Sequence, residues 1–153
     1  MAIMVRLGNP RLVPYRAEHL LLFYHRDASN YSDNVRFSVD KERQGPAFTA
    51  VYEDAVLGCA GVQIAWPGHG VAWSVFSPEI LKWPVWLTRT CRNALRDIIR
   101  SHNLRRVEMV AIAEDDNAIK WAYALGFVVE NGRAHRYTHS GEDVVRFELL
   151  GGT

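Results

Sequence analysis

The sequence predicts an α/β (α+β) fold, with a mixed but mostly antiparallel sheet flanked by helices. Three β-rich runs at 47–54, 56–66 and 71–77 follow one another with only short corners between them, which indicates antiparallel hairpins. A long amphipathic helix at 87–102 then leads to a strand at 105–113, and such a crossover makes two strands parallel. A shorter helix and two further strands complete the predicted order.

The bulk composition is that of one ordinary globular domain spanning 1–153. The chain has 153 residues, of which 48% are hydrophobic and 23% charged. A chain of this length and composition can bury a substantial core, and disorder is disfavoured. Its formal net charge of +1 gives no overall attraction to nucleic acid or to an anionic membrane. A basic binding site would therefore have to be local.

The two cysteines, Cys59 and Cys91, lie in separate apolar runs and do not form a disulfide framework. We interpret them as reduced core residues, which favours a cytoplasmic protein. The N-terminal stretch lacks the pattern of a signal peptide, and no run reaches the roughly 18 apolar residues of a membrane helix. The six histidines form no metal-ligand pair on a predicted helix, so we expect no metal.

The N-terminal third is the least sharply patterned part of the chain. Residues 2–7 form a possible strand, and 17–27 a predicted helix rich in leucine and aromatics. The segment 32–45 has helix punctuation, with Ser32 as a cap and a glycine followed by a proline at its end, although its apolar residues also alternate as in a strand.

The second half carries clearer helix and strand signals. The helix at 87–102 has an apolar stripe at helical spacing. Asp115 or Asp116 caps the next helix, and Gly126 supplies its left-handed stop. Strands at 127–131 and 144–150, with a turn at 140–143 before the second of them, follow.

The segment "NAIKWAYALGF" at 117–127, which follows a predicted strand, resembles a motif of the GNAT superfamily of N-acyltransferases. The resemblance extends over roughly 47–150, and the motif residues that match are Ala118, Ile119, Leu125, Gly126 and Phe127. It implies a single GNAT-like domain that binds acetyl-CoA or another acyl-CoA and transfers the acyl group to an amine of a small molecule or protein.

The resemblance also implies where the cofactor binds. The pantetheine arm would pair with the backbone of Trp73, Ser74, Val75, Phe76 and Ser77. The family's glycine-rich phosphate loop corresponds to 77–90, which contains no glycine and includes Pro84, a residue without an N–H. Lys82, Arg89 and Arg92 could instead supply positive charge to the phosphates.

The usual acid and base of the family have no direct counterparts. The position of the family's tyrosine acid holds Ala122; Tyr123 is the candidate acid but lies about 100° further round the helix, which favours a half-buried structural role. The strand 71–77 has no acidic residue. Glu53, Glu108 and Glu114 are interpreted as solvated surface carboxylates, and His69 as a solvent-facing turn residue.

Two further hypotheses belong to other functional classes. Segments 70–99 and 117–127 are similar to GNAT-like internal virion or assembly proteins of short-tailed phages, which lack the glycine loop. Such a non-catalytic protein would bind a phage structural protein, in the host cytoplasm or the virion.

The second hypothesis is a binding module that uses an arginine face of the long helix, formed by Arg89, Arg92, Arg96 and Arg100. It would bind an acidic partner or nucleic-acid phosphates. Without interleaved aromatic residues, nucleic acid is disfavoured, and a solvated helix face is the simpler interpretation. Trp83 and Trp86 are expected to pack or plug the loop rather than bind a ligand.

Overall fold

The computed structural model describes residues 8–24 and 31–151, and its strands form one sheet in the order β1-β2-β3-β4-β5-β7-β6. The strands are β1 (Arg11–Pro14), β2 (Ala47–Tyr52), β3 (Ala55–Trp66), β4 (His69–Phe76), β5 (Arg106–Ile112), β6 (Val128–Ala134) and β7 (Val144–Leu150). The helices are α1 (Ala17–Tyr24), α2 (Tyr31–Arg43), the 3-10 helix η2 (Pro78–Lys82), α3 (Pro84–Ser101) and α4 (Asp116–Ala124).

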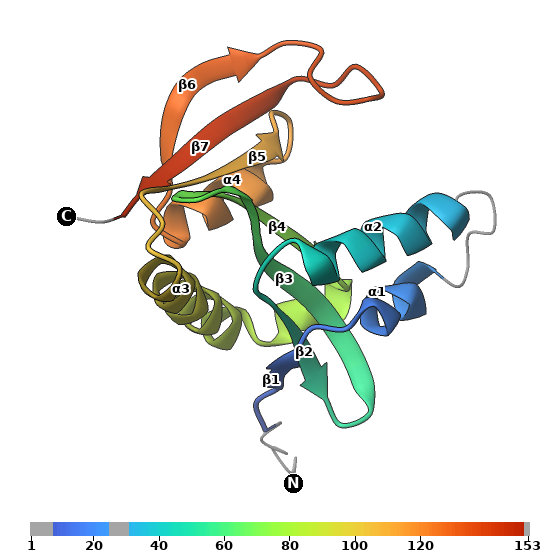
Figure 1. Cartoon of the computed structure of the whole chain (residues 1–153). Helices are drawn as coiled ribbons and strands as arrows, with labels where there is room; N and C mark the ends of the chain where they lie inside the picture. Colours follow the sequence, from blue (N-terminus) through green and yellow to red (C-terminus); the bar gives the residue numbers. More distant parts are fainter. Residues whose placement is uncertain (1–7, 25–30, 152–153) are drawn as a thin grey trace, which may run out of the picture.

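The sheet is antiparallel at every strand pair of the described residues except one. β4 and β5 run parallel, because α3 carries the chain from the end of β4 back to the start of β5. Helices α1 and α2 lie on one side of β2–β4, and α3 lies on the other, with α4 beside it against β5 and β7 (Figure 1). The predicted α/β architecture with a mixed, mostly antiparallel sheet is confirmed.

The N-terminal part differs from the prediction in one strand. The strand predicted at 2–7 lies outside the described residues, whereas β1 forms at Arg11–Pro14, where no strand was predicted. β1 is an edge strand whose Val13 pairs with Thr49 of β2, so its conformation comes from this neighbour rather than from its own short sequence. The segment 32–45 is helical in α2 and not a strand, but α2 begins at Tyr31, so Ser32 lies inside the helix and is not its cap.

The core is divided by the sheet. On the α3 and α4 side, Val62, Ile98 and Phe147 belong to a buried cluster in which the last is 0% exposed. On the α1 side, Tyr15 and Leu20 pack with Cys59 of β3. Both faces of the central strands are therefore covered, and this fixes the strand register.

The predicted ends of α4 are confirmed. The Asp115 carboxylate accepts a hydrogen bond of 3.0 Å from the Ala118 backbone N–H, and Gly126 adopts a φ of +101° just after the helix. Phe127 then donates its N–H to the Ala122 carbonyl and is 1% exposed. This tight turn holds α4 against the sheet beside the separation of β4 and β5 described next.

Candidate functional site

The two parallel strands in the middle of the sheet separate soon after they meet. β4 and β5 are paired only from His69↔Arg106 to Val71↔Glu108, although β4 continues to Phe76 and β5 to Ile112. Over this length the other edge of β4 remains paired with β3, and this pairing extends as far as Gly58↔Phe76. Residues 72–76 of β4 therefore present one backbone edge that is not paired with β5. We call this the seam.

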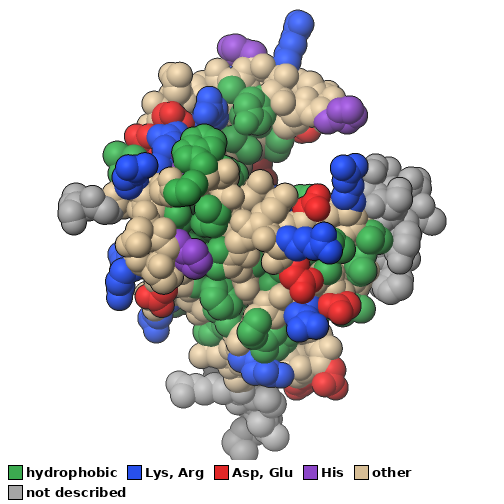
Figure 2. Space-filling view, in the orientation of Figure 1, with side chains coloured by type: hydrophobic (Ala, Val, Ile, Leu, Met, Phe, Trp, Pro, Cys, Tyr) green, Lys and Arg blue, Asp and Glu red, His purple; other side chains and the backbone are tan. Residues whose placement is uncertain are grey.

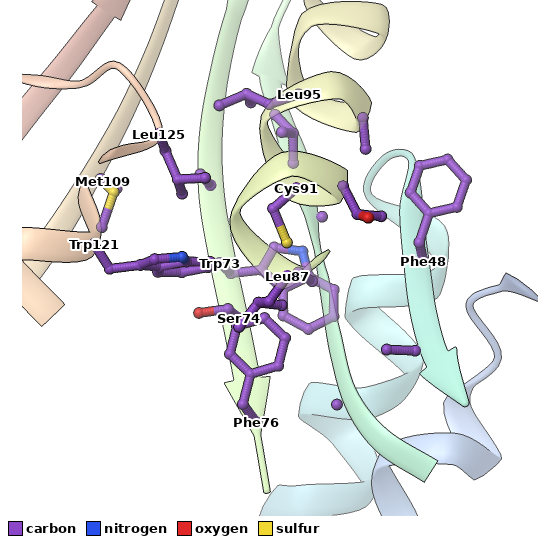
Figure 3. A pocket seen from close by; sticks show the side chains of 18 of the residues that line it. Phe48, Trp73, Ser74, Phe76, Leu87, Cys91, Leu95, Met109, Trp121 and Leu125 are labelled. Atoms are coloured by element: carbon purple, nitrogen blue, oxygen red, sulfur yellow. The ribbon is translucent and has the colours of Figure 1, made fainter. Parts of the chain in front are cut away.

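A cavity of ≈310 Å³ lies beside the seam, beneath α3. Its floor on the sheet consists of small residues, Gly58, Ala60, Ala72 and Ser74 among them. Figure 3 shows Leu87, Cys91 and Leu95 of α3 above it, Met109, Trp121 and Leu125 on one flank and Phe48 on the other. The lining is thus almost entirely apolar, and the space comes from the small side chains of the floor.

Trp121 of α4 extends toward β4 at this cavity (Figure 3). Its ring lies edge-on to Phe76, with the ring centroids 5.4 Å apart. The indole Nε1 is buried, and among the described residues it has no hydrogen-bond partner. Buried N–H groups in folded proteins are nearly always satisfied, so this donor is available to an acceptor at the cavity.

The five predicted pantetheine-contacting residues alternate across the sheet. Trp73, Ser74 and Phe76 line the cavity, but the Trp73 ring packs against Tyr15 at 5.4 Å and against Phe37 on the α1 and α2 side. Two further residues complete the set: Val75 packs in the cluster around Leu20, and Ser77 caps η2 by accepting a hydrogen bond from the Glu79 N–H. The backbone of 73–76 thus lies in the seam, and Ser77 lies just beyond it.

The segment that would correspond to the phosphate loop is closed by packing. The Trp83 indole N–H donates to the Gly8 carbonyl at 2.9 Å, and its ring packs on Tyr52 at 4.7 Å. Trp83 is 9% exposed, in agreement with the packing role that its sequence predicted. Trp86, by contrast, lines the cavity.

The start of α3 offers few backbone donors. Pro84 has no N–H, and the Leu87 N–H is already bonded to the Trp83 carbonyl at 2.9 Å. Within the first turn this leaves Val85 and Trp86 as backbone donors toward solvent. A phosphate at this position would have to be bound mainly by side chains.

The basic side chains of α3 occupy its outer face. Arg89, Arg92 and Arg96 line one surface groove, whose lining does not include Lys82. Arg92 is partly committed, because its Nε donates to the Ala124 carbonyl at 3.1 Å and its Nη2 also contacts that oxygen. This arginine neutralises the C-terminal end of α4, while Arg89 and Arg96 remain exposed.

The predicted acid is not part of the cavity lining. Tyr123 is 52% exposed and packs edge-on against Phe147, with ring centroids 5.5 Å apart. Ala122, at the position of the family's tyrosine, is 0% exposed. The structural role expected for Tyr123 agrees with this packing.

Two predictions for polar residues were wrong. His69 is buried, 9% exposed, and its ring stacks on Trp66 with centroids 4.1 Å apart, because β4 begins at this residue instead of a turn. Glu108 is half-buried, and its Oε1 lies 3.3 Å from His69 Nε2. Glu108 faces away from α3, because its neighbour Val107 is in the α3 core and strand side chains alternate.

Glu108 belongs to a cluster of ion pairs on this second face of the sheet. Arg106 contacts three carboxylates, Glu108 at 3.1 Å, Glu130 at 2.7 Å, and Glu148. Burial alone would raise the pKa of Glu108, but hydrogen bonds from Arg106 and His69 outweigh it and lower that pKa below its usual value. Glu108 is paired with Val71, so this carboxylate lies where the seam begins.

Figure 2 shows a recess between the β6–β7 end of the molecule and α2, with side chains of both charges around it.

Over residues 8–24 and 31–151, no helix is long and apolar enough to cross a membrane. The same residues contain no group of three or more His, Cys, Asp or Glu that could hold a metal ion.

Solved structures of acetyltransferases match this arrangement of elements. The ribosomal-protein-S5-alanine acetyltransferase of Vibrio fischeri superposes with a TM-score of 0.72 at 14% identity, covering 97% of this chain and 97% of that one. The fold is that of the GNAT N-acetyltransferases.

Two other structures give the same result. The spermidine/spermine N-acetyltransferase SpeG of Vibrio cholerae has a TM-score of 0.68 at 17% identity and covers 93% of this chain and 92% of that one. A GNAT-family acetyltransferase of Bacillus anthracis has a TM-score of 0.69 at 13% identity, with 94% and 97% covered. No protein-family model and no curated protein sequence matches the chain. Identities this low show the fold and leave the activity to be argued from the site.

Proposed function

We propose that the protein is an acyl-CoA-dependent N-acyltransferase of divergent type. The single observation that supports this most strongly is the seam, where β4 and β5 separate after three residue pairs beside an apolar cavity. An acyl thioester bound there would lie between the cavity on one face of the sheet and Glu108 on the other. This arrangement can hold a donor on one side while an acceptor approaches from the other.

Donor binding would use the free edge of β4. The backbone of 72–76 can pair with the amide groups of a pantetheine arm, as an added strand pairs with a sheet edge. The phosphates would meet Arg89 and Arg96, with Lys82 and the remaining N–H groups of Arg92, on the outer side of α3. Charged side chains would thereby replace the backbone nest that a glycine loop provides.

The acceptor would be an amine that enters from the face of Glu108 and Trp73. Its nitrogen attacks the thioester carbonyl carbon, the C–N bond forms, and the C–S bond breaks as the thiolate leaves. Glu108, directly or through water, accepts the proton from the nitrogen. His69, whose Nε2 lies 3.3 Å from the carboxylate, orients it. Water, or Tyr123 after a rotation away from Phe147, returns a proton to the thiolate.

The class of acceptor is suggested by the similar structures. Their names describe enzymes that act on a ribosomal-protein alanine and on spermidine or spermine. A protein or small-molecule amine is therefore the acceptor we propose.

Calorimetric titration with acetyl-CoA and with CoA tests the proposal. We expect micromolar binding that the double change Arg89→Ala and Arg96→Ala weakens and that higher salt also weakens. Arg100→Ala is the matched control, since Arg100 lies on the same helix outside the groove and pairs with Asp97 at 3.6 Å. Absence of heat with both ligands, together with an unchanged melting temperature, would overturn the proposal.

One observation favours a second candidate. The closed segment from η2 to Trp83, with no glycine and few backbone donors, is what a GNAT fold that has lost its CoA site would show. We propose as the alternative a non-catalytic binding protein. The hypothesis of a phage virion assembly protein is one form of this alternative. The titration described above separates the two, because this alternative requires that neither acetyl-CoA nor CoA binds.

A further inference from the structure

We propose that the cavity beneath α3 binds the hydrocarbon chain of an acyl donor longer than acetyl, and that the Trp121 indole N–H donates a hydrogen bond to the carbonyl of that donor. The inference rests on the proposed function and adds the class of acyl group. It is built from the volume, the course and the polarity of the cavity, and from one buried donor without a partner among the described residues.

The volume exceeds what an acetyl group needs. The cavity measures ≈310 Å³. An engineered apolar protein cavity of about 150 Å³ already binds benzene, and ligand pockets begin at roughly 300 Å³. Acetyl adds one methyl group beyond the thioester carbonyl, so most of the space would remain empty with that donor.

The course of the cavity suits a chain. It extends from Phe76 and Trp86 near the seam, past Ala72 and beneath α3, to Phe48 and the edge strand β1. At the far end it shares walls with a second groove between α3 and β2, namely Leu12, Phe48, Thr90, Ala94 and Ile98. An elongated space of this kind accommodates an extended hydrocarbon better than a compact ring.

The floor is made of residues smaller than those usual in central strands. Ala50, Ala60 and Ala72 occupy positions where β-branched or aromatic residues would close the space. The space is therefore encoded in the sequence of three adjacent strands and is not a single packing fault. Its apolar lining gives water few partners, so a hydrocarbon is a better occupant than solvent.

Trp121 adds a chemical requirement for the occupant. Its Nε1 is buried and has no hydrogen-bond partner among the described residues, and the ring lines the flank of the cavity next to Phe76. In an acyl thioester, the acceptor attached directly to the hydrocarbon chain is the carbonyl oxygen. A carbonyl at Trp121 would place the chain beneath α3 and would polarise the bond that the amine attacks. Free CoA has no such carbonyl, and this difference makes the role testable.

The experiment measures the binding of CoA, acetyl-CoA, hexanoyl-CoA and decanoyl-CoA to the whole protein by calorimetry. We expect hexanoyl-CoA to bind at least about tenfold more tightly than acetyl-CoA, because each buried methylene adds to the affinity. Equal affinity for acetyl-CoA and the longer thioesters would overturn the inference and leave the proposed function intact. Failure of all four compounds to bind would overturn both. This comparison needs only the natural sequence, so it does not depend on how any variant folds.

Two variants then locate the chain and the carbonyl. Ala94→Leu fills the cavity from α3 and should remove the advantage of hexanoyl-CoA, while the same change at exposed Ala55 should leave it unchanged. Trp121→Phe keeps an aromatic ring but removes the N–H, and we expect weaker binding of every thioester with unchanged binding of CoA. Equal weakening of CoA and thioesters by Trp121→Phe would show a packing role and contradict the hydrogen bond.

Discussion

At the scale of single residues, the α4 helix directs Trp121, and not Tyr123, toward the cavity. Ala118, Trp121 and Leu125, which are spaced as on one face of a helix, pack on the core. The sequence could not predict that the indole N–H lacks a partner among the described residues, because that depends on where β4 passes in space.

The hydroxyl of Tyr123 is expected to be dispensable. Tyr123→Phe keeps the edge-on contact with Phe147 and removes only an exposed group. We therefore expect kcat to stay within about twofold of the natural protein, measured with the best acyl donor. A general acid contributes about 10²–10⁴-fold. A loss of that size in Tyr123→Phe, with unchanged donor affinity, would assign the acid to this residue after all.

Glu108 is expected to affect both transfer and acid stability. Its pKa is lowered in the folded protein, so it contributes stability above its unfolded pKa, near 4.5, and this contribution is lost as the pH falls through the lower folded pKa. Glu108→Gln should reduce transfer by roughly 10²-fold. The melting temperature of Glu108→Gln should also fall less than that of the natural protein when the pH is lowered from neutral to below that unfolded pKa.

The matched control is the same change at Glu53, which is exposed. We expect neither transfer nor acid stability to change in Glu53→Gln. If Glu108→Gln kept full activity, the proton acceptor would have to be another group. If the melting temperature of Glu108→Gln fell with pH as much as that of the natural protein, the Glu108 carboxylate would not stabilise the fold through its ion pair with Arg106.

At the scale of secondary-structure elements, local signals predicted the helices better than the first strand. The apolar stripe of α3 and the cap and glycine stop of α4 are written in neighbouring residues, and the structure confirms them. β1 carries no such signal, since its short run depends on β2 for its hydrogen bonds. His69 and Glu108 were misjudged for a related reason: pairing of β4 with β5 brings them together from distant parts of the chain, which single-sequence patterns do not reveal.

The cap of α4 gives a prediction at this scale. Asp115→Ala removes the acceptor of the Ala118 N–H. It should reduce the free energy of unfolding by about 1 kcal/mol. For a chain of this size that corresponds to a melting temperature lower by roughly 2–4 °C, measurable by circular dichroism. Asp116→Ala serves as the control because it removes a first-turn charge without removing the cap, and a loss equal to that of Asp115→Ala would contradict the assigned cap.

At the scale of the whole molecule, the order of elements was sufficient to predict the fold, but not the site. The cavity arises because small residues of β2, β3 and β4 come into register beneath α3, and such coincidence is a property of the assembled sheet. The basic groove was predicted in part, because Arg89, Arg92 and Arg96 of the predicted arginine face line it, whereas Arg100 does not.

The two thiols should be unreactive in the folded protein. Burial raises the pKa of Cys59 to about 11 and that of Cys91 to about 12, so near neutral pH almost no thiolate is present. A colorimetric disulfide reagent should label both only after unfolding.

Alkali should destabilise the protein through these thiols. In the unfolded chain they ionise near their ordinary pKa of 9.0, whereas in the folded protein burial keeps them protonated to higher pH. Above the unfolded pKa the unfolded state therefore binds fewer protons, and stability falls as the pH rises toward the folded values. The melting temperature measured across this range should decrease. Rapid labelling of the native protein near neutral pH would contradict the burial on which both expectations depend.

The seam also has a mechanical consequence. β5 is joined to β7 by seven residue pairs, but to β4 by only three, so the sheet consists of two well-bonded halves with a short junction between them. Partial opening should therefore begin at this junction, with each half retaining its protected amides, and hydrogen exchange would then report two cooperative units in place of one. A molecule that bridges the junction would merge them, and the change from two exchange regimes to one would reveal occupancy even before any product is known.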